Sequence, residues 1–193
     1  MRTTPFTARR RLALVGLSLA TIAGLGACGD DTDDDAGADT VVTTTVADEP
    51  STATIRLVDF GFEDVPESVP AGTKLEVVNE SEGELHELVA FRLADDEQRP
   101  LSELLALPQA EAMAILGEPA TVLLQAPGGE TIPAVGDGTL AEPGRYVLMC
   151  AIPTGVDPAV YLEAAAASQG GPPQVEGGAP HFAHGMVAEL TVD

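Results

Sequence analysis

Short apolar runs separated by glycine and proline turns make up most of the chain from residue 52 onward. Apolar and polar residues alternate between Arg56 and Phe62, and another strand-like run spans Thr73 to Val78. Turn-forming residues flank the second run, in VPAG and NESEG. LHELVAFRL, GRYVLMC and GMVAELTV are three further candidate strands. Strands this short, punctuated in this way, predict an all-β fold, a β-sandwich.

Two stretches interrupt the strand pattern. In RPLSELLALPQAEAMAILGE, leucines and Met113 recur at helical spacing on either side of Pro108, which predicts two short helices covering a sheet edge or face. In DPAVYLEAAAAS, Asp157 is the expected N-cap and Pro158 the first helical residue. We therefore expect one domain at residues 52–193, with insertions at about 95–120 and 154–180.

Residues 1–27 are predicted to form a lipoprotein signal peptide. Arginines precede the stretch LALVGLSLATIAGLGAC, which is too short for a membrane span and typical of a secretory signal. Its end, LGAC, resembles the bacterial lipobox, which implies cleavage before Cys28 and lipidation of that residue. An uncleaved anchor or an ordinary signal peptide is the alternative. RRRLAL also resembles a twin-arginine signal, so the export route stays open. We expect the protein to be lipid-anchored at the outer face of the cytoplasmic membrane.

The charge limits the classes of partner. Residues 28–51 are acidic and rich in threonine, which predicts a disordered tether. Four of the nine basic residues precede Cys28 and none of the 31 acidic residues does, so the mature chain has five against 31, a net charge of −26. This balance disfavours nucleic acid and anionic lipid headgroups. It favours a cation or a basic protein, with membrane contact through the lipid anchor only.

The cysteine count singles out Cys150. If Cys28 carries lipid, Cys150 has no partner for an internal disulfide. A lone thiol outside the cytoplasm is either buried and inert or bound to a ligand. His86 begins one predicted strand, Cys150 ends another, and His181 and Met186 lie just before and at the start of the last. In a Greek-key sandwich such strand ends can meet at one pole. Two imidazoles, a thiolate and a thioether form the donor set of a blue copper site.

From about residue 54 to 193 the sequence resembles the cupredoxins, the blue copper β-sandwiches. VPAGTKLEVVNESEGELHEL is similar to the stretch that leads to their first histidine ligand, and PGRYVLMC to the segment that ends in their thiolate ligand. HFAHGM is similar to the last part of their ligand loop, in which four residues separate a histidine ligand from a methionine ligand. The resemblance implies a Greek-key sandwich that binds one type 1 copper ion through His86, Cys150, His181 and Met186. It also implies one-electron transfer to a redox partner protein.

One departure from the family concerns the ligand loop. Thirty residues, 151–180, separate Cys150 from His181, where cupredoxins have only a few. CAIP and PHFAHGM resemble two halves of a family loop opened by an insertion, and His184 is an alternative ligand to His181. A loop that holds His181 far from Cys150 would favour a metal-free interaction lipoprotein with the insertion as its recognition surface. Copper storage or delivery is a further alternative.

Other chemistry has little support in the sequence. No two carboxylates are arranged as a general acid and base, and Glu87 is expected to lie on a solvated face. Cys150 lacks an oxyanion-hole signature that would favour a thiol nucleophile. Cysteine and two histidines could also hold zinc, which prefers stronger ligands than methionine. The sequence therefore predicts a metal-binding protein that is not an enzyme.

Overall fold

The structure is a computed structural model that describes residues 51–168 and 171–193. The predicted signal peptide, the lipidation site Cys28 and nearly all of the predicted tether lie outside the described residues. Within the described ranges, no helix is both long and apolar enough to cross a membrane.

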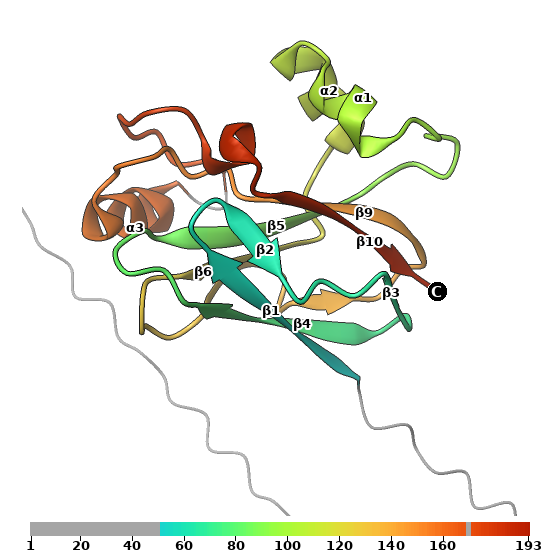
Figure 1. Ribbon diagram of the computed structural model, residues 1–193, viewed down its shortest axis with the longest axis horizontal. Coiled ribbons are helices and arrows are strands. Elements are labelled where there is room, and N and C mark those ends of the chain that lie inside the picture. The colour runs from blue at the N-terminus through green and yellow to red at the C-terminus, as the bar shows by residue number, and fades with distance from the viewer. Residues whose placement is uncertain (1–50, 169–170) are drawn as a thin grey trace, which may run out of the picture. The chain divides into compact units, whose positions relative to one another are not determined.

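The strands form two sheets (Figure 1). The smaller has the order β2-β1-β4-β8, with β1 Thr52–Val58, β2 Gly61–Glu63, β4 Thr73–Asn79 and β8 Thr139–Leu140. The larger has the order β3-β10-β9-β5-β6-β7, with β3 Ser68–Val69, β5 His86–Arg92, β6 Thr121–Gln125, β7 Ile132–Val135, β9 Gly144–Met149 and β10 Val187–Val192. The pairs β1–β4 and β10–β3 are parallel, and the other pairs are antiparallel. The prediction of an all-β sandwich is confirmed.

Strand β5 is buried on both of its faces. His86, Leu88 and Ala90 belong to the face toward the smaller sheet, where the main core lies. Val89 and Phe91 belong to the opposite face and a second apolar cluster. A strand buried on both sides is continuously apolar rather than alternating, as in the LVAF segment of this strand.

One expectation about strands is corrected. The alternating run from Arg56 to Phe62 is not one strand, because the chain reverses at Asp59 and Phe60 and pairs Val58 with Gly61. Phe60 has a φ of 60°, a conformation uncommon outside glycine, which the alternating pattern did not reveal. Strands β6 and β7 were not anticipated. Pro133 marks β7 as an edge strand, where a missing N–H is tolerated.

Three helices cover the outer side of the larger sheet and its end. Helices α1 (Leu101–Leu105) and α2 (Gln109–Leu116) place Leu104 and Leu116 in the second apolar cluster, on the side away from β1 and β4 (Figure 1). Helix α3 (Pro158–Ala167) begins as predicted, with the Asp157 carboxylate accepting hydrogen bonds from the first turn.

Candidate metal centre

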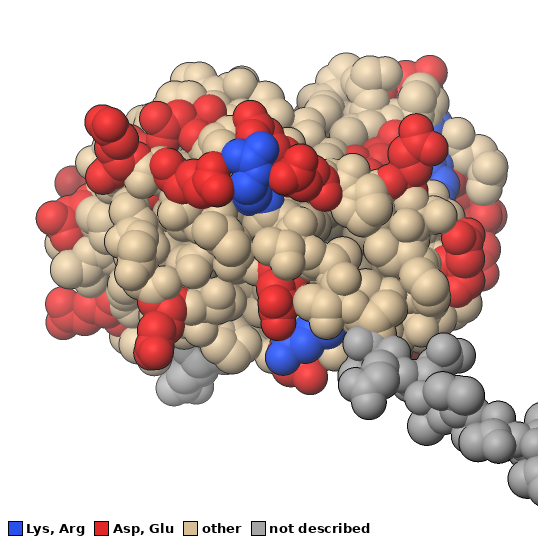
Figure 2. Space-filling model, turned by 60° about the horizontal axis from the view of Figure 1, so that its bottom comes forward, with Lys and Arg blue, Asp and Glu red and all other residues tan. Residues whose placement is uncertain are grey.

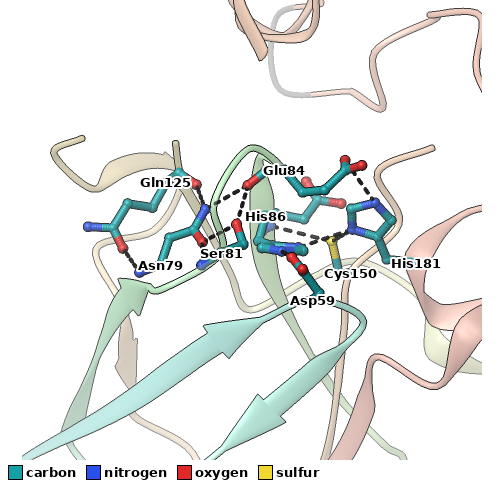
Figure 3. Close-up of polar contacts among 9 residues, drawn as sticks. Asp59, Asn79, Ser81, Glu84, His86, Gln125, Cys150 and His181 are labelled. Carbon is teal, nitrogen blue, oxygen red and sulfur yellow. Dashed lines mark hydrogen bonds and ion pairs between the residues drawn. The ribbon is translucent and has the colours of Figure 1, made fainter. Parts of the chain in front are cut away.

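Three side chains from distant parts of the chain converge at one end of the sandwich (Figure 3). The Nδ1 atoms of His86 and His181 are 3.1 Å apart, and Cys150 Sγ lies 3.4 Å from His181 Nδ1. All three residues are 0% exposed, and their donor atoms lie within 4.8 Å of one another. Nitrogen and sulfur atoms that bind one ion at about 2.0–2.3 Å are about 3–4 Å apart. The spacing therefore fits a single metal ion.

Asn79 fixes the loop that leads to His86. Its side-chain amide donates hydrogen bonds to the carbonyl oxygens of Glu84, at 2.9 Å, and Gln125, at 2.7 Å. Its Oδ1 atom accepts hydrogen bonds from the backbone N–H and the hydroxyl of Ser81. The asparagine is 7% exposed, so these bonds are largely shielded from water. The loop thus delivers His86 to the start of β5 in one orientation.

The insertion between Cys150 and His181 is closed at its base. Phe182 N–H donates to the Cys150 carbonyl at 2.8 Å, and His181 N–H donates to the Ile152 carbonyl at 3.0 Å. Thr154 N–H donates to the Ala179 carbonyl at 3.0 Å. These bonds hold the two ends of the insertion side by side, so its length does not separate His181 from Cys150.

Met186 and His184 occupy different environments. The Met186 side chain is 0% exposed, its N–H donates to the His181 carbonyl, and its carbonyl accepts from Cys150 N–H. Its backbone is therefore bonded to two of the three clustered residues. His184 is exposed, and its ring centroid lies 5.0 Å from that of Phe60, so it stands outside the cluster.

Two carboxylates face the far nitrogens of the clustered imidazoles. His181 Nε2 lies 3.6 Å from Glu84 Oε2, and His86 Nε2 lies 4.0 Å from Asp59 Oδ1 (Figure 3). Both Nε2 atoms are buried without a hydrogen-bond partner. A metal bound at Nδ1 places the proton on Nε2, where a nearby carboxylate stabilises it. The sequence contains no motif that marks these two carboxylates, and they were not anticipated.

Burial sets the charge state of the donors. Burial, with a further effect of His181, lowers the pKa of His86 to about 4, and burial also lowers the pKa of His181. Both imidazoles are therefore neutral at pH 7, the form that binds metals. Burial, followed by the nearby Glu87 carboxylate, raises the pKa of the Cys150 thiol. A cation bound to the sulfur supplies the charge that a buried thiolate needs.

Glu87 is not on a solvated face, which corrects the expectation from sequence. It is 5% exposed, with Oε1 accepting from Ala151 N–H at 3.0 Å and Oε2 accepting from the Tyr161 hydroxyl at 3.3 Å. Its own N–H donates to Cys150 Sγ at 3.4 Å. Burial raises the pKa of the Glu87 carboxyl to about 7. The error arose because the insertion carries Tyr161 over the outer face of β5, a contact that no local pattern reports.

Phe60 is the exposed aromatic side chain in contact with the cluster. Its ring meets that of His181 edge-on, with centroids 5.2 Å apart and an angle of 87° between the planes. Phe60 is 36% exposed, whereas His181 is 0% exposed. The turn between β1 and β2 thus places an aromatic ring between one clustered imidazole and the surface.

No family model and no curated protein matches the chain. Among solved structures, it is similar to dithionite-reduced auracyanin from Roseiflexus castenholzii, with 22% identity, coverage of 74% of this chain and 97% of that one, and a TM-score of 0.40. It is also similar to auracyanin B, with 20% identity and a TM-score of 0.41; the match covers 77% of this chain and 93% of auracyanin B. A third similar structure is auracyanin A of Chloroflexus aurantiacus, described as a "blue" copper protein, with 18% identity and a TM-score of 0.41. The match covers 75% of this chain and 100% of auracyanin A.

The assignment of the centre depends on the side chains of this chain. His86, Cys150 and His181 supply two neutral nitrogen donors and one sulfur donor in a site closed to water. This set is the one that type 1 copper takes, with a methionine as a weak further ligand. The structure thus has the two sheets that the sequence predicted and brings together three of the predicted donors, which fit one type 1 copper ion.

Proposed function

We propose that this protein is a one-electron carrier of the blue copper type, exported and held at the outer face of the cytoplasmic membrane through Cys28. The observation that carries the proposal is the convergence of His86 Nδ1, His181 Nδ1 and Cys150 Sγ within 4.8 Å of one another. A loop holding His181 away from Cys150 would have favoured a metal-free interaction protein, and the 3.4 Å separation supports the copper site instead.

The residues around the centre suit electron transfer more than substrate chemistry. Bound copper supplies a one-electron couple at the site. Asn79 and the closed base of the insertion hold His86, Cys150 and His181 in place, which limits movement of the ligands between oxidation states. The clustered side chains are 0% exposed, which excludes water and leaves little room for a substrate. The buried Met186 would supply a thioether as a weak further ligand, which would tune the potential.

We further propose that electrons pass between the site and its partner near Phe60. The Phe60 ring contacts His181 and reaches the surface. A partner protein bound at this point would therefore be separated from His181 by one aromatic ring. Acidic side chains are numerous on the face drawn in Figure 2 and basic ones are few. A mature net charge of −26 favours a basic partner, because opposite charge speeds association.

Visible spectroscopy tests the proposal. The purified chain with one equivalent of Cu(II) should show intense absorption from thiolate-to-copper charge transfer. Cys150→Ser should abolish the band while the fold is kept, because serine is nearly isosteric. A colourless wild-type protein that loses copper on dialysis would contradict the proposal. Slow electron exchange combined with ready transfer of copper to an acceptor would instead indicate storage or delivery.

A further inference from the structure

A cavity of about 680 Å³ lies between helices α2 and α3, on the outer face of the larger sheet. Val89, Phe91 and Leu124 from β5 and β6 line it, together with Leu162 of α3 and Met113 of α2. The three strand residues are at most 7% exposed. Sites for small molecules are mostly apolar and have volumes of about 300–1,000 Å³. The two insertions therefore build a cavity of that size on the face of the larger sheet that points away from the smaller sheet.

Two buried polar side chains also line this cavity. Glu87 is 5% exposed and Tyr161 is 3% exposed. The Glu87 carboxylate accepts two hydrogen bonds, from Ala151 N–H and the Tyr161 hydroxyl. A carboxylate has about four acceptor positions, and a protonated carboxyl retains acceptor capacity. Glu87 can therefore accept a further hydrogen bond from a molecule in the cavity.

We propose that the cavity binds a neutral, largely apolar molecule with a hydroxyl group that donates a hydrogen bond to Glu87. Apolar walls favour the body of such a molecule, and the acceptor among them selects for the donor. Anions are disfavoured, because Glu87 and Glu118 line the cavity and the mature chain has a net charge of −26. This binding function goes beyond electron transfer and does not require copper.

A matched pair of ligands tests the hydrogen bond. 2-Naphthol carries one hydroxyl donor, and 2-methoxynaphthalene has nearly the same shape without the donor. Equilibrium dialysis against the purified full chain should show about fivefold tighter binding of 2-naphthol, as expected for one additional hydrogen bond. 2-Naphthoate should not bind measurably. The affinities should agree between the copper-free and copper-treated chains, so a failure of copper binding leaves this test intact.

Two tryptophan variants test the location. Ala134 is exposed on β7 and lines the cavity, so Ala134→Trp should fill it and weaken binding of 2-naphthol at least tenfold. Val78→Trp is the control, because Val78 is 42% exposed on β4 of the other sheet and does not line the cavity. The control should bind as the wild type does. Both substitutions suit strand positions, where aromatic residues are favoured.

Glu87→Gln tests the acceptor, since it should reduce the preference for 2-naphthol over 2-methoxynaphthalene. If this variant does not fold, the ligand pair and Ala134→Trp still decide the question. Equal affinities of the wild type for the two ligands would overturn the role of Glu87. Binding that survives Ala134→Trp, or an absence of binding by the wild type, would overturn the site.

Discussion

The Nδ1 atoms of His86 and His181 face each other at 3.1 Å although 95 positions separate the two residues. Without a metal, two neutral imidazoles at this distance can share only one proton between the facing nitrogens. A metal ion accepts both lone pairs at once and leaves each Nε2 protonated, facing Asp59 or Glu84. The metal-bound form thus gives every ring nitrogen a favourable neighbour.

Substitutions of His181 and His184 should show which of the two histidines is a metal ligand. His181→Ala should abolish the charge-transfer band, because it removes a buried nitrogen donor 3.4 Å from Cys150 Sγ. His184→Ala is the matched control, three positions away on the same 3-10 turn but exposed, and it should keep both the band and the copper stoichiometry. Loss of the band in His184→Ala with its retention in His181→Ala would reverse the assignment.

Met186→Leu should keep the colour and change the potential. Leucine preserves the volume of a fully buried side chain but offers no lone pair, so the free energy of unfolding should fall by less than about 1.5 kcal/mol. If Met186 is the weak thioether ligand that we propose, its removal should raise the reduction potential, measured by voltammetry. Met113→Leu, on the exposed side of α2, should leave the potential unchanged. Equal potentials in wild type and Met186→Leu would show that Met186 is not a ligand.

The carboxylates beside the imidazoles should favour the more highly charged oxidation state. Glu84→Gln and Asp59→Asn each remove a negative charge that lies 3.6 or 4.0 Å from a ligand ring. Each variant should raise the reduction potential by an amount on the order of tens of millivolts, less at high salt. Glu76→Gln, an exposed change of the same charge on β4, is the control. A potential that moves equally in all three variants would indicate only an effect of net charge.

The insertion should prove dispensable for the metal centre. Thr154 and Gly178 are bonded to each other at its base, so replacing residues 155–177 with two glycines should leave His181 beside Cys150. The shortened chain should still bind Cu(II) with the charge-transfer band. It should lose at least about 3 kcal/mol of unfolding free energy in urea, because the buried side chains of Tyr161 and Val156 are removed. A folded but colourless shortened chain would contradict this account of the loop.

The parts of the fold that the sequence predicted are those with local signals. Asp157 and Pro158 marked the start of α3, and His86, Cys150 and His181 lay in motifs tied to strand ends. The turn at Phe60 was missed because apolar alternation continued through it. The burial of Glu87 was missed because its cover, Tyr161, lies 74 positions away. Contacts of that kind depend on how the insertion packs, which no local pattern contains.

Strands β6 and β7 show the same limit. TVLLQ has the composition of a buried strand, but it directly follows two helices and the insertion expected at about residues 95–120. Its pairing with β5 places Gln125 opposite His86, beside Asn79. The support for the loop before His86 therefore comes in part from a strand that the pattern of apolar residues did not single out.

Copper location is the most direct test of the central claim. A crystal structure of the copper-loaded chain, with anomalous scattering recorded at the copper edge, should show one ion bound by Nδ1 of His86, Nδ1 of His181 and Sγ of Cys150, with the Met186 sulfur as a longer fourth contact. An ion bound elsewhere, or no ion between these three side chains in crystals grown with copper, would contradict the account.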